Sequence, residues 1–113
     1  MHELSLVSSM LDTVANAMPP GTCLAEVRVT LGPLCGVSPD ALEFCFVELA
    51  RERGFPAARL QIARTSSRAK CKSCDHSYDL SSFDAVCPEC GTLDRSIESG
   101  REFTLDSIEV EEA

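Results

Sequence analysis

The spacing of apolar residues changes along the chain and predicts first a helix and then a strand. Apolar side chains recur every three or four positions over residues 3–18, which predicts an amphipathic helix that ends at the Pro-Pro-Gly run of residues 19–21. Between Cys23 and Leu31 the period becomes two, with Val27 on one face and Glu26 on the other. This alternation predicts a half-buried strand.

A second helix and strand follow a turn-rich link at residues 32–36. Ser38 can cap a helix whose first turn holds Pro39 and Asp40. Apolar and polar residues then alternate over residues 58–64, which predicts another strand. The apolar face expected for the helix consists of Leu42, Cys45, Phe46 and Leu49.

The end of the chain predicts one more strand, with a bulge. Apolar residues alternate from Phe103, the phase slips at Asp106 and Ser107, and the alternation resumes at Ile108. Such a strand needs a sheet to join, and the nearest one belongs to residues 1–64.

These elements predict an α+β fold with two helices on a small mixed three-stranded sheet and an inserted zinc-ribbon module. Residues 1–68 plus 97–113 are expected to form the α/β domain, and residues 69–96 the inserted module. The insertion has few apolar residues, chiefly Tyr78, Leu80, Phe83 and Val86, so metal binding should drive its folding.

Four cysteines carry the strongest chemical signal. Cys71 and Cys74 form one CxxC pair, Cys87 and Cys90 another, and 12 residues separate the pairs. Two such knuckles can bring four thiolates to one tetrahedral ion, for which closed-shell Zn²⁺ is the usual occupant. Iron in a rubredoxin-like site would use the same four ligands, although the scarcity of aromatic residues weakens that interpretation.

Charge and cysteine usage narrow the class of protein. The formal net charge is −8, and four thiolates around one Zn²⁺ would bring it to about −10, which disfavours binding to phosphate backbones. The odd number of cysteines, the CxxC pairs and the absence of an export signal or membrane-spanning stretch predict a cytoplasmic protein. The cysteines outside the two pairs are then spare thiols: Cys23, Cys35 and Cys45.

The two histidines suggest different roles. His76 follows the first knuckle closely, so it could hydrogen-bond a thiolate, replace a cysteine as a ligand, or simply be exposed. A change in its charge near neutral pH would make it a modulator of the zinc site. His2 can chelate a metal through its ring and its amide nitrogen together with a free Met1 amine. A deprotonated amide suits planar Ni²⁺ or Cu²⁺, and Glu3 or Asp40 could fill a remaining position. Asp40 would also favour the helix dipole.

Several segments together resemble the HypA/HybF family of hydrogenase nickel-insertion chaperones. The segments are MHELSLVSSML at the start, CGVSPDALEF, the two CxxC pairs and SGREFTLDSIEVEE near the end, so the resemblance covers nearly the whole chain. Its most specific element is Met-His-Glu at residues 1–3 combined with a downstream zinc ribbon.

The resemblance implies a nickel carrier with a structural and regulatory zinc site. It implies nickel binding by His2 with the Met1 amine and the Glu3 backbone, an acidic nickel-site residue at Asp40, and zinc on the four paired cysteines. The implied partners are a HypB-type GTPase, the large subunit of nickel-iron hydrogenase and, in some cases, urease maturation proteins. The oligomeric state expected is a monomer or a weak homodimer. Cys35 stands where the family pattern predicts a small polar residue, and no role follows for it.

The sequence is also compatible with other classes of function. A zinc ribbon that touches nucleic acid or the transcription machinery would use a local basic strip, whereas a redox protein would use the thiols themselves. An enzyme is not expected, because the sequence has no recognisable nucleophile-base pair and no phosphate-binding glycine loop. The basic strip consists of Arg51, Arg53, Arg59, Arg64, Arg68, Lys70 and Lys72.

Overall fold

A computed structural model describes residues 2–80 and 85–113 of the chain, which forms two compact units. Met1 and one part of the cysteine module, which includes Phe83, lie outside the described residues. No helix in the described part is long and apolar enough to cross a membrane. The first unit contains Met1–Thr30, Val37–Ala63 and Thr104–Ala113, and the second contains Leu31–Gly36 and Arg64–Phe103.

Both predicted helices are present in the first unit. Helix α1 (His2–Ala17) buries one face, on which Val7, Met10, Leu11 and Val14 recur at helical spacing. Helix α2 (Pro39–Glu52) begins as predicted, because the Ser38 hydroxyl accepts the Ala41 N–H at 3.3 Å. Its buried residues are Leu42, Cys45, Phe46 and Ala50, so Ala50 is buried where Leu49 was expected.

The end of α2 is attached to α1 by one arginine. The guanidinium of Arg53, the C-cap residue of α2, donates to the Asp12 carboxylate at 2.5 Å and to the Ser8 hydroxyl at 2.9 Å. These contacts join two residues of one helix to the end of the other. They add a polar clamp to the apolar contact between the helices.

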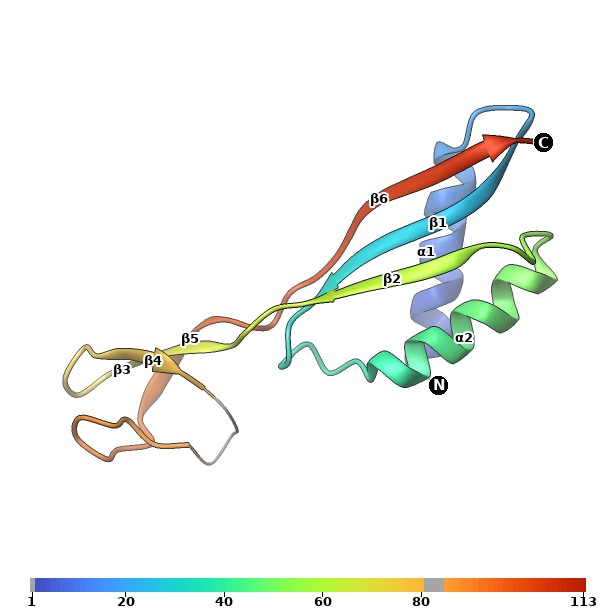
Figure 1. Cartoon of the computed structure of the whole chain (residues 1–113). Coiled ribbons are helices and arrows are strands. Elements are labelled where there is room, and N and C mark those ends of the chain that lie inside the picture. Colours follow the sequence, from blue (N-terminus) through green and yellow to red (C-terminus); the bar gives the residue numbers. More distant parts are fainter. Residues whose placement is uncertain (1, 81–84) are drawn as a thin grey trace. The chain divides into compact units, whose positions relative to one another are not determined.

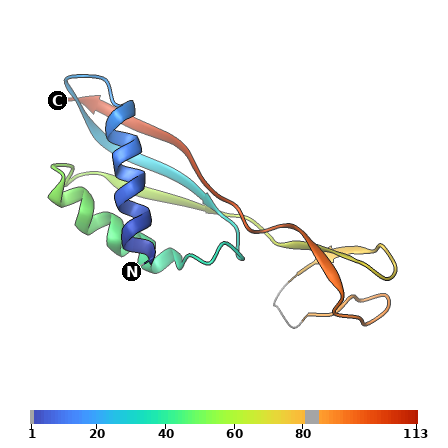
Figure 2. The same ribbon diagram turned by 180° about the vertical axis from the view of Figure 1, so that it is seen from behind.

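The expected three-stranded sheet of this unit has the order β2-β1-β6. Strand β1 (Thr22–Leu31) lies in the centre, between β2 (Arg59–Arg64) and β6 (Phe103–Glu112). The arrows for β1 and β2 point the same way and that for β6 points the opposite way, so the sheet is mixed (Figure 1). Helix α1 crosses one face of the sheet, as the views from both sides show (Figure 2).

The burial of Glu26 corrects the expectation that it faces solvent. Glu26 is 6% exposed although its neighbour Val27 is also buried. Its carboxylate lies 2.5 Å from the Arg28 guanidinium and 3.9 Å from that of Arg59 on the adjacent strand. Long side chains from two strands therefore cover the acid, and opposite charges offset the desolvation of its carboxylate.

The phase slip predicted in the last strand is present in β6. Asp106 and Ser107 are both exposed, whereas the apolar residues before and after them are half-buried. The Asp106 carboxylate accepts the Thr30 hydroxyl, and the Arg28 guanidinium donates to the Ser107 hydroxyl at 3.4 Å. Two consecutive residues thus meet the same face of β1, as a bulge requires.

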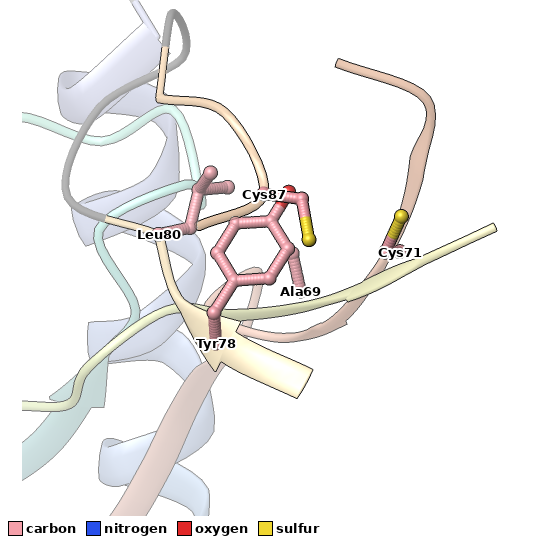
Figure 3. Packing of buried hydrophobic residues seen from close by; sticks show 5 residues of the cluster. All are labelled: Ala69, Cys71, Tyr78, Leu80 and Cys87. Carbon is pink, nitrogen blue, oxygen red and sulfur yellow. The ribbon is translucent and has the colours of Figure 1, made fainter. Parts of the chain in front are cut away.

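The second unit contains an antiparallel sheet that the apolar pattern did not predict. Its order is β4-β3-β5, and the central strand pairs Ala69 with Tyr78 on one side and with Ile97 on the other. A small buried cluster lies against it, formed by Ala69, Cys71, Tyr78, Leu80 and Cys87 (Figure 3). The strands are β3 (Arg68–Cys71), β4 (Ser77–Asp79) and β5 (Arg95–Ser99).

The core of this unit differs in part from the expected one. Tyr78 and Leu80 are buried as expected, but Val86 is 47% exposed, and Phe83 falls outside the described residues. The thiol-bearing Cys71 and Cys87 take part in the core instead. The metal ligands themselves therefore form part of the hydrophobic core.

A close backbone contact holds residues 31–36 within the second unit. The Gly32 N–H donates to the Glu102 carbonyl at 2.8 Å, and the Leu34 N–H donates to the Gly100 carbonyl at 2.6 Å. A Cβ on Gly32 would overlap the Gly100 carbonyl, so only glycine fits there. The contact brings Leu34 against the buried cluster of Figure 3.

Candidate metal centres

The first cysteine knuckle is shaped by backbone hydrogen bonds around Cys71. The Cys71 N–H donates to the His76 carbonyl at 2.9 Å, and the Asp75 N–H donates to the Cys71 carbonyl at 3.0 Å. Asp75 adopts the left-handed conformation, with φ of 63°. Cys71 ends strand β3 and is buried, whereas Cys74 lies in the following turn and is exposed.

The second knuckle repeats this arrangement. The Cys87 N–H donates to the Thr92 carbonyl at 3.0 Å, and the Gly91 N–H donates to the Cys87 carbonyl at 2.8 Å. Gly91 has a φ of 76°, and again the first cysteine is buried while Cys90 is exposed. Two turns of the same form thus each present one inner and one outer sulfur.

The four sulfurs converge as the spacing predicted. Their ligand atoms all lie within 4.8 Å of one another, with Sγ atoms 3.4 Å apart for Cys71 and Cys90 and 3.6 Å apart for Cys74 and Cys87. A tetrahedron with metal–sulfur bonds of about 2.3 Å has edges of about 3.8 Å. The donor set and its dimensions therefore fit one thiolate-bound Zn²⁺.

Burial, backbone hydrogen bonds and neighbouring thiols shift the pKa values of Cys71, Cys74 and Cys90 in different directions. Burial raises the pKa of Cys71, but hydrogen bonds from the backbone N–H groups of Cys74 and Ser73, with contacts to neighbouring thiols, lower it to about 7. The His76 N–H lowers the pKa of Cys74, yet burial and the other sulfurs outweigh it and raise this pKa to about 12. In Cys90 the Thr92 N–H lowers the pKa, whereas Cys71 and burial raise it, with a net upward shift. The Cys71 thiol thus ionises readily, whereas the thiols of Cys74 and Cys90 need a cation to lose their protons.

His76 follows Cys74 by two residues, and its carbonyl accepts the Cys71 N–H. Its imidazole is half-buried and stacks on the Tyr78 ring, with centroids 6.4 Å apart and planes 8° from parallel. Tyr78 in turn packs in the same buried cluster as Cys71 and Cys87. The ring is therefore held by packing and is more restrained than the simple exposure that was one alternative.

The candidate nickel residues lie at the starts of the two helices of the first unit. His2 opens α1 and is exposed, and Asp40 is exposed in the first turn of α2. The Glu3 carboxylate accepts the Ser38 N–H at 3.3 Å, which joins the two helix starts. Hydrogen bonds from the backbone N–H groups of Glu3 itself and of Ser38 lower the pKa of this carboxyl.

These residues do not form a closed cage of side-chain ligands. In the parts of the chain that the structure describes, the four cysteines are the only cluster of three or more cysteine, histidine or acidic side chains with converging ligand atoms. Any site at the amino terminus would therefore depend on backbone nitrogen donors and Met1, and the Met1 amine lies outside the described residues.

Comparison with known proteins decides the family. A family model described as "Hydrogenase/urease nickel incorporation, metallochaperone, hypA" matches residues 1–110. The chain belongs to the HypA family. The resemblance found in the sequence is thereby confirmed over nearly the whole chain.

Individual relatives agree with this family. The chain is 37% identical over 114 residues to the hydrogenase maturation factor HypA of Chlorobium luteolum, a match that covers 99% of this chain and 97% of that protein. It is 34% identical over 111 residues to HypA of Geobacter metallireducens, covering 98% of this chain and 100% of that protein. These proteins are factors of the hydrogenase maturation machinery.

Solved structures support the fold as well. The solution structure of the nickel metallochaperone HypA from Helicobacter pylori matches with a TM-score of 0.59 and 25% identity, covering 95% of each chain. A second solution structure, of a HypA protein, matches with a TM-score of 0.62 and 25% identity over 96% of this chain and 95% of that chain. The α+β fold with a four-cysteine module is thus the fold of a metallochaperone family.

Sequence reasoning missed two contributors to the zinc module. Asp75 supplies in the first knuckle the left-handed turn that Gly91 supplies in the second, and its place directly after a CxxC pair was a usable signal. Leu34 packs against the buried cluster although it lies far away in sequence. Nothing in its local pattern indicates that contact.

Proposed function

We propose that this protein is a nickel metallochaperone that binds Ni²⁺ at its amino terminus and delivers it to the large subunit of nickel-iron hydrogenase. Membership of the HypA family supports the class of function. The four-cysteine group is proposed to hold a resident Zn²⁺ with a structural and regulatory role, while Ni²⁺ is cargo. The protein is proposed to act as a carrier and not as an enzyme.

The hydrogen bond between Glu3 and Ser38 carries the proposal for the nickel site. It fastens the start of α1, where His2 lies, to the start of α2, and Asp40 follows Ser38 by two residues. A short flexible peptide would have to lose conformational freedom when it closed around an ion. The fastened helix starts reduce that cost, which supports binding at this place.

The start of a helix also offers the nitrogen donors that Ni²⁺ favours. The first N–H groups of an α-helix have no backbone acceptor within the helix, so the amides of His2 and Glu3 can lose their protons without breaking the helical ladder; the Glu3 amide would give up only its hydrogen bond to the Glu3 carboxylate. The proposed ligands are the Met1 amine, the His2 amide and ring, and the Glu3 backbone. Asp40 is proposed as an acidic neighbour of the bound ion.

The exposure of this site suits a carrier. His2 and Asp40 both reach solvent, so ligands from a partner can replace them one at a time. The amide nitrogens must lose protons to bind, so nickel affinity should fall as the pH drops. Proposed partners are a HypB-type GTPase, the hydrogenase large subunit and urease maturation proteins, with the carrier acting as a monomer or weak homodimer.

His76 is proposed to modulate the zinc site. Its ring stacks on Tyr78, and Tyr78 shares a buried cluster with two zinc ligands. Loss of the ring should therefore loosen packing around the sulfurs. Equal rates of zinc transfer to a chelator from the parent and from His76→Leu would contradict this role.

The alternative of a nucleic-acid or transcription-associated module receives no comparable support. Four of the seven basic residues in the predicted strip have carboxylate partners within 4.0 Å, which reduces the local positive charge. The paired residues and their partners are Arg51 with Glu48, Arg53 with Asp12, Arg59 with Glu26, and Arg68 with Asp79.

Transfer of radioactive nickel tests delivery directly. Zinc-loaded protein carrying ⁶³Ni would be mixed with nickel-free hydrogenase large subunit, separated from it, and the nickel on the large subunit counted. We expect transfer from the parent and from Ser5→Ala, an exposed position on α1 that serves as a control, and a large loss with His2→Ala. Equal transfer from His2→Ala and the parent would reject the proposed route.

A further inference from the structure

The outer edge of strand β6 is a feature that nickel and zinc binding leave unexplained. β6 spans 10 residues and lies at one end of the sheet order β2-β1-β6, so only one of its edges is paired with a strand in the described part of the chain. Figure 1 shows it along the border of the sheet. Its unpaired edge presents a row of backbone N–H and C=O groups that can accept another strand.

The two edge strands of the sheet differ in length and in the sign of their charge. Strand β2 has only 6 residues and carries Arg59 and Arg64 at its two ends. Short length and positive charge are common protections of edge strands, and proline is another. Over its full length β6 contains no lysine, arginine or proline.

The charge on β6 indicates the kind of partner. Its four ionisable side chains are all acidic: Asp106 accepts hydrogen bonds from Thr30 and Thr104, and Glu109 lies 3.6 Å from Arg28. Glu111 and Glu112 are exposed and have no ion-pair partner among the residues that the structure describes. The free charge on this edge is therefore negative.

The apolar side chains of β6 are only partly covered by the rest of the protein. Leu105, Ile108 and Val110 are all half-buried, whereas the valines of the central strand β1 are fully buried. A strand laid beside β6 would place every second side chain next to these three residues. The alternate side chains would lie on the face that carries Glu109 and Glu111.

We propose that the free edge of β6 binds an extended segment of a partner protein in which aliphatic and basic residues alternate. Backbone hydrogen bonds to the edge would hold the segment, and its aliphatic side chains would complete the cover over Leu105, Ile108 and Val110. Its lysines or arginines would lie on the face of Glu111, and Glu112 at the end of the strand would add to the local negative field. This mode of binding is β-strand addition in which opposite charges provide selectivity. It requires no metal at the amino terminus.

A synthetic peptide tests this proposal. The probe is a fluorescent peptide of about ten residues that alternates valine and lysine, enough to match the strand, and it is titrated into zinc-loaded, nickel-free protein. Saturable binding with slowed hydrogen exchange at β6 amides is expected. No saturable binding, or slowed exchange only at other elements, would overturn the proposal. Because nickel is absent, the outcome does not depend on the nickel function.

Two charge-reversal variants separate the edge from general acidity. The double variant Glu111→Lys/Glu112→Lys should weaken peptide binding by about tenfold at low salt, since exposed charges contribute mainly through their local field. Glu43→Lys/Glu52→Lys changes the net charge equally on helix α2, at exposed positions, and should bind like the parent. Equal weakening in both variants would contradict a site on β6.

Peptides with methylated backbone nitrogens test the strand pairing itself. In a strand that adds to β6, the N–H groups of only every second residue face the edge. Methylation of that set should abolish binding, and methylation of the other set should preserve it. Equal affinity of the two methylated peptides would show that charge alone holds the probe and would overturn the proposal.

Discussion

Asp75 and Gly91 hold equivalent positions in the two cysteine knuckles. Each lies in the left-handed region, with φ of 63° and 76°, and each donates its N–H to the carbonyl of the first cysteine in its knuckle, at 3.0 and 2.8 Å. The two turns therefore share one backbone design although one uses aspartate and the other glycine. The shared left-handed conformation and its hydrogen bond, and not the type of residue, position the sulfurs.

The Gly91 position should tolerate a residue better the more readily that residue adopts the left-handed backbone conformation. A Cβ there would have no atom within 4 Å, so the cost of a substitution is conformational. Gly91→Val should cost about 2 kcal/mol and weaken zinc binding by at least about tenfold, while Gly91→Asn should cost less than about 1 kcal/mol. Competition with a zinc chelator measures both. Equal affinities for the two variants would contradict this account of the turn.

Replacement of Gly32 by any residue with a Cβ should destabilise the second unit, because this position lies against the backbone of Gly100. Gly32→Ala would push a methyl group into the Gly100 carbonyl, and backbone cannot move aside cheaply. We expect a loss of about 2 kcal/mol or more in the free energy of unfolding. Gly36→Ala is the control, since its Cβ meets open space and only its φ of 81° is unfavourable. Denaturation that affects both variants alike would argue against the close contact.

Zinc affinity should rise steeply with pH. The pKa of Cys74 is raised to about 12 and that of Cys90 is also raised, so both thiols hold protons near neutral pH in the absence of metal. Zinc must displace those protons, whereas Cys71, with its pKa of about 7, is already ionised above neutrality. We expect affinity to increase at least about 100-fold per pH unit between roughly pH 7 and 8. Chelator competition that gives about tenfold or less would contradict the thiol acidities.

The Ser38 N–H should matter to nickel binding separately from the Ser38 hydroxyl. Ser38→Ala removes only the helix cap, whereas Ser38→Pro also removes the N–H that Glu3 accepts; the Ser38 φ of −77° suits proline. We expect Ser38→Pro to bind Ni²⁺ about fivefold more weakly than Ser38→Ala, the equivalent of about 1 kcal/mol. Calorimetry would measure both, and circular dichroism would check that α2 stays intact. Identical nickel affinities would show that the contact between the helix starts is dispensable.

The elements of the first unit could be predicted because their residue spacing reports burial. Helices α1 and α2 and strands β1, β2 and β6 all carry clear periods of apolar residues. Glu26 broke this rule because its cover comes partly from Arg59, a residue on another strand. Spacing alone cannot show a long-range ion pair that hides an acid.

The second unit was less predictable for a physical reason. Its strands have 4, 3 and 5 residues, too short to show a period, and its core includes two of the metal ligands. Cysteine spacing identified the site where hydropathy could not identify the sheet. The role of Leu34 depends on the Gly32 and Gly100 contact, which joins segments far apart in the sequence.

Calorimetric titration of Ni²⁺ into zinc-loaded, untagged protein tests the central claim most directly. Parent protein would be compared with His2→Ala, with a variant that has extra residues before Met1, and with Ser5→Ala as a control. We predict one nickel site in the parent and the control, and its loss both in His2→Ala and in the extended chain, because both remove donors of the amino-terminal chelate. Unchanged nickel binding in both altered proteins would contradict the amino-terminal site.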